Sequence, residues 1–426
     1  MTQENQWPLG KSAAMGALVV AVLLGVFDFA DRMIIGSIFP HLKEHYGVTD
    51  TQLGMLAGVI NWVIAVLVVP CGILVDRWSR KKMVAIMMVI WAVGSGLTFL
   101  VPNMGTAAAA GTVGAGFGVL VAARALIGFG ESAYTPAMQS LLSVSFPMRW
   151  RSTAVGMQQY GTNLGCMIGI AVGAFVAGKW GWQHALGLMC IPGLIVGLSA
   201  LKLTDYPNAP RSAEGKGPGI GATIASLFKR KSLVYVYCAQ ALSLCFNYTL
   251  SLWLITYLTR VAGMEHGRAS FFTVLLLVCS STSLLVSGPF LDWLRSKSRV
   301  FAIRVIGLFI LISFLCTFIA FYCLDPGHGL QIVMIFAGAV FSIPMVCMNF
   351  ALNADLTRVE ERGTSTSLLL VIMNIVGAGG GPVILGLLSD RFELNNAIIM
   401  LSFCVLAAAA FYFFLSFSYQ RDLPKK

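Results

Sequence analysis

The chain has 426 residues, of which 57% are hydrophobic and only 11% are charged. A soluble domain carries about 25% charged residues, so this composition excludes ordinary cytosolic enzymes, nuclear proteins and extracellular domains. The 29 Lys and Arg outnumber the 18 Asp and Glu and give a net charge of +11, which in a membrane protein indicates basic cytoplasmic loops rather than nucleic-acid binding. We therefore predict an integral membrane protein.

Apolar stretches long enough to cross a bilayer recur along the whole chain. A transmembrane helix needs about 20 apolar residues. We predict an all-α membrane protein with twelve such helices in two bundles of six. The predicted spans begin near Ala14, Gln52, Met83, Phe117, Ser152 and His184, and then near Ser232, Ala269, Val300, Leu330, Thr364 and Asn395.

A polar segment divides the two predicted bundles. The domains are expected at residues 1–204 and 232–426, joined by a cytoplasmic linker at 205–231 that contains Pro207 and Pro210. The end of this linker, residues 224–231, has the pattern of a short interfacial helix. The first eleven residues are polar and a long apolar span follows, so we expect no cleaved signal peptide.

Lys and Arg are distributed unevenly over alternate loops. If both termini are cytoplasmic, twenty-two of the 29 basic residues lie on the cytoplasmic side and five on the opposite side. This ratio of roughly four to one is a strong positive-inside signal. It predicts a multi-pass protein of the inner or plasma membrane with both termini in the cytoplasm.

Chemistry-bearing motifs of other protein classes are missing from the sequence. The ten cysteines form no CxxC pair and lie almost entirely in apolar spans, so we expect neither a disulfide framework nor a metal site. No nucleophile motif, phosphate-binding loop or charge ring supports an enzyme or a channel. We expect no cofactor and a monomeric protein.

Two pairs of segments repeat between the halves. Gly72 and Asp76 share their spacing with Gly288 and Asp292, which lie 216 residues later. A second set of three residues recurs with an offset of 211; it pairs Arg151, Asn163 and Gly169 with Arg362, Asn374 and Gly380. Two nearly equal offsets indicate a six-plus-six duplication, which is how many transporters are built.

Over essentially its full length the chain resembles the major facilitator superfamily. The segment from Gly72 to Lys82 looks like the signature that follows the second helix of this superfamily, with Ser79 in place of the usual glycine. Within the superfamily the chain resembles the spinster-like group most, and the anion:cation symporter group is the alternative. The segments that carry this resemblance are Phe29–Arg32, Asp50–Gly54, Gly128–Pro136, Gly181–His184, Asn374–Pro382 and Ser389–Arg391.

Five charged residues fall inside predicted spans, and each costs roughly 2.5–3.5 kcal/mol at a helix centre. Asp28 and Arg32, four residues apart, can pair on one face of the first helix, whereas Asp31 and Arg32 are adjacent and cannot face each other. Arg124 and Glu131 are seven residues apart and share a face of the fourth helix. Mutual neutralisation within the bundle is one interpretation of the five.

Proton coupling is the other interpretation of these charges. The spinster-like resemblance implies that Asp31, Arg32 and Glu131 couple proton movement to substrate movement, with Asp28 and Arg124 beside them. Burial favours the neutral form of a carboxylic acid, and a nearby Arg favours the charged form. A carboxylate that gains and loses its Arg partner can therefore take up a proton on one side of the membrane and release it on the other. When unpaired, Arg32 can hold an anionic substrate group.

A third set of residues lies at predicted cytoplasmic helix ends. The resemblance implies a gate there, and the plain alternative is a set of topology-setting charges in solvated loops. The gate residues would be Gly72, Asp76, Arg77 and Arg80, their weaker counterparts Asp292 and Arg295, and the partners Arg151 and Arg362.

Polar residues at mid-span are candidates for substrate contact, although each is equally consistent with an interhelical hydrogen bond. The candidates are Arg32, Tyr134, Gln159, Asn163, Asn247, Tyr248 and Asn374. Glycines recur every four residues from Gly161 to Gly173, and such a stripe predicts a close helix–helix contact rather than a binding site.

The predicted function is secondary active transport of a small organic anion or an amphipathic, lipid-like molecule by alternating access, driven by protons. A lysolipid flippase or scramblase, or an exporter that protons do not drive, is the alternative. The sequence leaves open the substrate, import or export, symport or antiport, protons or Na⁺, and the conformational state.

Overall fold

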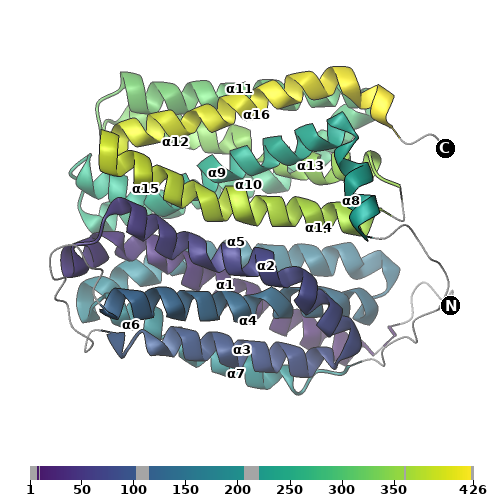
Figure 1. Cartoon of the computed structure of the whole chain (residues 1–426), viewed down its shortest axis with the longest axis horizontal. Coiled ribbons are helices and arrows are strands. Elements are labelled where there is room, and N and C mark those ends of the chain that lie inside the picture. The colour runs from purple at the N-terminus through teal and green to yellow at the C-terminus, as the bar shows by residue number, and fades with distance from the viewer. Residues whose placement is uncertain (1–6, 9, 102–114, 206–219, 359–360, 424–426) are drawn as a thin grey trace. The chain divides into compact units, whose positions relative to one another are not determined.

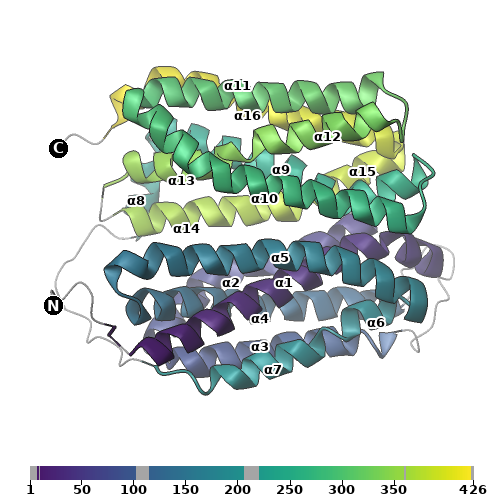
Figure 2. The same ribbon diagram turned by 180° about the vertical axis from the view of Figure 1, so that it is seen from behind.

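The computed structural model describes residues 7–8, 10–101, 115–205, 220–358 and 361–423. Within these ranges every regular element is a helix (Figures 1 and 2). This agrees with the physics of a bilayer, where helices satisfy their backbone hydrogen bonds internally.

Seven helices are found in the described residues of the first half of the chain. They are α1 (Lys11–Tyr46), α2 (Asp50–Arg77), α3 (Arg80–Leu97), α4 (Ala115–Ser145), α5 (Met148–Trp180), α6 (Trp182–Gly187) and α7 (Cys190–Ala200). The last two follow each other closely and together fill the sixth predicted span.

A short helix, α8 (Ile220–Phe228), precedes the second half and overlaps the interfacial helix expected at residues 224–231. The second half then contains α9 (Lys231–Arg260), α10 (His266–Lys297), α11 (Arg299–Phe318), η3 (Ile319–Cys323), α12 (Gly329–Ser342), α13 (Pro344–Asp355), α14 (Arg362–Ile372), η4 (Met373–Gly380), α15 (Gly381–Phe392) and α16 (Leu394–Asp422). The segments η3 and η4 are π-helical and are parts of the ninth and eleventh predicted spans. The tenth predicted span consists of two consecutive α-helices, α12 and α13.

The twelve predicted spans are confirmed as helices, each beginning within four residues of its predicted start. Eleven helices in the described ranges are long and apolar enough to cross a membrane. The remaining predicted span, the third in chain order, is α3, which has 18 residues and begins with Arg80, Lys81 and Lys82. These three basic residues interrupt its apolar stretch at one end, where charged side chains reach the membrane interface.

The chain forms two compact units. The first comprises residues 1–48 and 59–212, and the second comprises residues 49–58 and 213–426. The first two and a half turns of α2 thus group with the second unit, although they precede it by more than 150 residues. The division expected from chain order, at residues 204 and 232, does not include this exchange.

Close contact between α1 and α5 dominates the first unit. A Cβ added at Gly165 would lie 2.2 Å from the carbonyl oxygen of Val26, and one at Gly169 would lie 2.3 Å from that of Ala30. Only glycine permits the two backbones to approach this closely. The predicted glycine stripe is therefore a packing surface, and it sets the rotation of α1 and with it the direction of the charged side chains on that helix.

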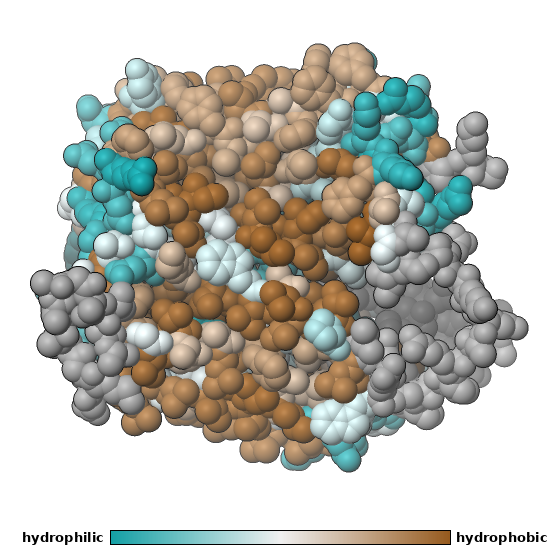
Figure 3. Space-filling model, viewed as in Figure 1, coloured by the Kyte–Doolittle hydropathy of each residue, from teal (hydrophilic) through white to brown (hydrophobic). Residues whose placement is uncertain are grey.

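In the second unit, α9 packs against α16, η4 and α15, and α16 also packs against α11. Glycines again allow close contact, because a Cβ added at Gly381 would lie 2.5 Å from the carbonyl oxygen of Cys245. Large apolar side chains remain exposed on outer helices, among them Phe271 at 62% and Phe413 at 61%. Apolar residues cover the middle of the visible face and hydrophilic residues gather toward the helix ends (Figure 3), as lipid contact requires.

Candidate functional site

Arg32 lies at the centre of a polar cluster inside the first unit. Its Nε donates to Asp28 Oδ1 at 2.9 Å, and its Nη1 donates to Asn61 Oδ1 at 2.9 Å. Its Nη2 donates to Glu131 Oε2. One guanidinium thus joins three helices, because Asp28 and Arg32 lie on α1, Asn61 on α2 and Glu131 on α4.

The local sequence explains how these side chains meet. Asp28 and Arg32 form the i,i+4 pair that their spacing predicts. The seven-residue spacing of Arg124 and Glu131 places both on one face of α4, and this face is directed at α1. The adjacent residues Asp31 and Arg32 point to different partners, as their spacing requires.

Asp31 and Arg124 form a second ion pair in the same unit. Arg124 Nη1 donates to Asp31 Oδ2 at 2.5 Å. The two side chains have relative exposures of 0% and 1%. The structure therefore divides the five intramembrane charges into an enclosed pair and a triad around Arg32.

Two carboxylate oxygens of the cluster have no hydrogen-bond partner among the described residues. They are Asp31 Oδ1 and Glu131 Oε1. By contrast, both oxygens of Asp28 are engaged, because Tyr134 Oη donates to Oδ2 while Arg32 donates to Oδ1. An orphan carboxylate oxygen in an apolar bundle is a position where a bound proton removes an uncompensated charge.

The charges of the cluster do not balance. Asp28, Asp31 and Glu131 carry three negative charges when ionised, and Arg32 and Arg124 carry two positive ones. Binding one proton makes the five residues neutral as a set. Since a net charge is costly in low dielectric, the cluster favours one bound proton unless another cation or an opening to water compensates it.

Arg32 is also the most accessible member of the cluster. Its side chain is 11% exposed, against 8% for Asp28 and 1% for Glu131. Its guanidinium lies 4.9 Å from the centre of the Phe29 ring. A planar guanidinium with partial access to water is suited to an anionic group such as a phosphate or carboxylate.

The other predicted substrate contacts separate into different environments. Tyr134 belongs to the charge cluster. Asn247 donates to Ser243 and accepts from Ser342 at 2.9 Å, which is an interhelical bond between α9 and α12. The remaining side chains range from half-buried to exposed: Asn163 and Tyr248 are half-buried, Gln159 is exposed, and Asn374 donates to the carbonyl oxygen of Leu370 at 2.9 Å.

Four of the eight predicted gate residues lie on helices whose side-chain environment at those positions is outside what the structure describes. They are Gly72, Asp76, Arg77 and Arg151. Arg80 is buried at the start of α3 and lies 4.0 Å from Asp205, which also accepts from Ser79 at 2.7 Å.

The gate residues of the second half include one ion-paired arginine and two exposed residues. Arg295 pairs with Asp355 at 2.7 Å, and Tyr419 donates to the same carboxylate at 2.8 Å. Asp292 and Arg362 are exposed and form no ion pair within the described part of the chain. Asp355 is thus the acceptor at the centre of this cluster.

Sequence reasoning missed a cluster at the opposite end of the second unit. Arg260 at the end of α9 donates two hydrogen bonds to Asp50, at 3.0 and 2.7 Å. Ser389 donates to Asp50 at 2.5 Å, and Asp390 accepts from the backbone N–H groups of Asp50 and Thr51 at 2.9 Å each. Asp390 therefore caps the amino end of α2, where helices favour a carboxylate.

Asn61 was also missed, although an Asn within an apolar span is a recognisable signal. Its amide oxygen accepts from Arg32. In the second unit, Asn349 joins Gln240 and Tyr412 through hydrogen bonds of 2.5 Å each. Among the described residues no group of His, Cys, Asp and Glu is arranged to hold a metal ion.

Comparisons with known proteins show the family and the fold of the chain. The sequence model of the Major Facilitator Superfamily matches residues 21–382. The sphingosine-1-phosphate transporter SPNS2 of Xenopus tropicalis is 22% identical over 458 aligned positions, which cover 98% of this chain and 84% of that protein.

Solved structures show the same fold. A bacterial homologue of the human lysosomal transporter Spinster, in an inward-facing and unoccupied conformation, superposes with a TM-score of 0.83 at 18% identity, over 98% of this chain and 99% of that one. The inward-open xylose transporter XylE of E. coli superposes with a TM-score of 0.74 at 14% identity, over 94% and 95% of the two chains. The spinster-like resemblance is confirmed, and the chain belongs to the Major Facilitator Superfamily as a multi-pass membrane transporter.

Proposed function

We propose that this protein is a proton-coupled secondary transporter that works by alternating access in the inner or plasma membrane, with both termini in the cytoplasm. Its substrate is a small organic anion or an amphipathic, lipid-like molecule. The observation that carries the proposal is the unbalanced cluster of three carboxylates and two guanidiniums in the first unit.

Asp31 and Glu131 are the proposed proton acceptors. Each has one engaged and one orphan carboxylate oxygen, so a proton can be added to either without breaking its bond to an Arg. Asp28 is not a proposed acceptor, because Arg32 and Tyr134 already donate to its two oxygens.

Arg32 links the proton to the substrate. When Glu131 is protonated, its attraction for the guanidinium falls, and Arg32 is shared by Asp28 and any anion that reaches its exposed edge. When the proton leaves, Glu131 competes with that anion for Arg32. This competition makes proton binding and substrate binding energetically dependent on each other, which is the requirement for coupling.

An amphipathic anion is the favoured substrate class. SPNS2 of Xenopus tropicalis is named as a transporter of sphingosine-1-phosphate, which has a phosphate head and a long apolar tail. The phosphate of such a molecule suits Arg32, and Gln159, Asn163, Asn247, Tyr248 and Asn374 remain candidates for the other contacts. The cytoplasmic gate stays a proposal for Asp76, Arg77 and the residues grouped with them above.

Transport into proteoliposomes under an imposed pH gradient tests the proposal. The purified protein is expected to accumulate an anionic lysolipid or organic anion against its gradient, and a protonophore is expected to abolish accumulation. Replacing Na⁺ by K⁺ at constant pH gradient is expected to change nothing. Transbilayer movement that depends neither on the pH gradient nor on Na⁺ would overturn proton coupling and favour a scramblase. Accumulation that requires Na⁺ would instead make Na⁺ the coupling ion.

A further inference from the structure

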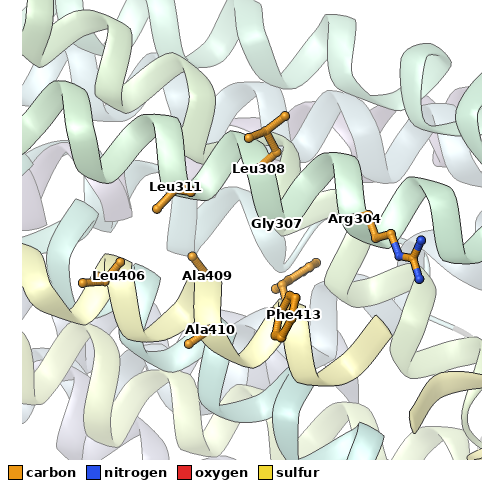
Figure 4. Close-up of a pocket in the computed structure, with 9 residues that line it drawn as sticks. Arg304, Gly307, Leu308, Leu311, Leu406, Ala409, Ala410 and Phe413 are labelled. Atoms are coloured by element: carbon orange, nitrogen blue, oxygen red, sulfur yellow. The ribbon is translucent and has the colours of Figure 1, made fainter. Parts of the chain in front are cut away.

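The second unit carries an apolar groove that the transport mechanism does not use. It lies between α11 and α16 and has a volume of about 360 Å³ (Figure 4). Leu308, Leu311 and Leu406 line it together with Phe413, and Arg304 stands at one end. Leu308 is 53% exposed and Phe413 is 61% exposed, so the groove belongs to an apolar surface of the kind that faces lipid.

Small residues create the groove. Gly307, Ala409 and Ala410 leave room between the two helices where larger side chains would fill it. A Cβ added at Gly307 would already lie 3.3 Å from Cβ of Tyr412. The volume lies near the lower end of the range of about 300–1,000 Å³ for small-molecule pockets, which suits a segment of one acyl chain better than a whole lipid.

Arg304 is the charged residue of this groove. It lies five residues after the first residue of α11, or about 7.5 Å along the helix axis, and its side chain extends toward the amino-terminal end of that helix (Figure 4). Arg304 forms no ion pair with any described residue, and it is exposed. The side chain of an arginine at this depth is expected to extend to the membrane interface and to bind an anionic group there.

Neighbouring arginines at the same end of the unit have protein partners. Arg295 and Arg299 lie 2.7 and 3.7 Å from Asp355, and Arg421 lies 3.7 Å from Asp422. No acid of the described ranges pairs with Arg304, yet an acyl-sized groove begins beside it. This combination of a cation and an adjacent apolar groove matches the two ends of a phospholipid.

We propose that the groove binds an anionic phospholipid of the cytoplasmic leaflet, with its phosphate on Arg304 and one acyl chain between α11 and α16. The assignment to this leaflet uses the proposed orientation. The site itself is independent of the charge cluster in the first unit, so failure of the coupling mechanism would leave it standing.

Native mass spectrometry of the full-length protein in detergent tests the proposal, with dioleoyl phosphatidylglycerol and dioleoyl phosphatidylcholine as probes. The wild type is expected to bind phosphatidylglycerol more tightly. Arg304→Gln is expected to weaken that binding about ten-fold, the loss of one charge-assisted hydrogen bond, and to weaken phosphatidylcholine less, because the choline cation already neutralises the phosphate of that lipid. Arg421→Gln is the matched control and is expected to keep the preference.

A second variant tests the acyl-chain part of the site. Ala410 is exposed, so Ala410→Leu fills the groove without disturbing the core and is expected to weaken both lipids. Ala171→Leu, at an exposed position on α5, is the control and is expected to weaken neither. The unfolding temperature of each lipid-free variant shows whether it is folded.

Equal binding of the two lipids by the wild type would overturn the proposal, and so would an unchanged preference in Arg304→Gln. Slower transport by this variant in vesicles of phosphatidylcholine alone would also contradict it, because the groove would then serve the transported molecule.

Discussion

Arg124 donates to Asp31 across 2.5 Å, from helix α4 to helix α1, and neither side chain has more than 1% exposure. The pair joins two helices whose interacting residues are 93 positions apart. One oxygen of Asp31 and two nitrogens of Arg124 nevertheless lack partners among the described residues. The contact is therefore both a structural tie and a place where a change of protonation alters the balance of charge.

Arg124→Gln is expected to lower the free energy of unfolding by about 3–5 kcal/mol, since it leaves Asp31 as an uncompensated buried charge. Thermal unfolding in detergent measures the effect. The double variant with Asp31→Asn is expected to be more stable than the sum of the single losses predicts, because it removes both charges together. Additive losses would contradict the pairing.

Glu131→Gln and Asp31→Asn are each expected to abolish accumulation driven by a pH gradient while counterflow exchange continues. The amide keeps the shape of the carboxyl group but cannot take up a proton, so exchange of substrate for substrate survives and coupling does not. Proteoliposome uptake assays measure both activities. Glu44→Gln changes an exposed residue of α1 and is expected to behave as the wild type. Accumulation by both amide variants would remove the two acids from the mechanism.

Tyr134→Phe is expected to slow transport without uncoupling it. The variant removes the donor to Asp28 Oδ2, and a hydrogen bond to a charged group contributes about 1.5–3 kcal/mol. Asp28 keeps its bond to Arg32, so accumulation driven by a pH gradient is expected to persist at a lower initial rate. Initial rates and the final level of accumulation in proteoliposomes test this expectation. Loss of accumulation like that of Glu131→Gln would instead make Tyr134 part of the proton path.

Gly169→Ala is expected to prevent the first unit from packing correctly, since the added Cβ would lie 2.3 Å from a backbone oxygen of α1. Gly178→Ala lies on the same helix, and its Cβ would meet nothing within 4 Å. This control is expected to be neutral or to stabilise by about 0.5–1 kcal/mol, the helix preference of Ala over Gly. Monodispersity and unfolding temperature distinguish the two, and equal behaviour would contradict the close contact of α1 with α5.

Asp50→Asn is expected to destabilise the second unit by about 1.5–3 kcal/mol, because Arg260 and Ser389 lose a charged acceptor. The Arg260 side chain is 34% exposed, so water compensates part of the loss and places the effect toward the lower value. Glu265→Gln, an exposed change close to Arg260 in the chain, serves as the control. An unchanged unfolding temperature in Asp50→Asn would show that the pair adds no stability.

Hydropathy alone predicted the helices with good accuracy, because a bilayer demands long apolar helices and penalises every charge inside them. This energetic penalty also identified five charged residues as candidates for a functional role: Asp28, Asp31, Arg32, Arg124 and Glu131. Local spacing predicted one ion pair as well, since the i,i+4 geometry of α1 sufficed to pair Asp28 with Arg32.

Partners on other helices depend on how each helix is rotated, and hydropathy carries no such information. The rotation of α1 follows from its backbone contacts at Gly165 and Gly169, and only the folded unit shows that Arg124 then meets Asp31 while Asn61 meets Arg32. The sequence by itself therefore determined which charges lie in the membrane. The tertiary structure decided which of them form ion pairs and which carboxylate oxygens lack a hydrogen-bond partner among the described residues, because packing of small residues, rather than hydrophobicity, sets helix rotation in lipid.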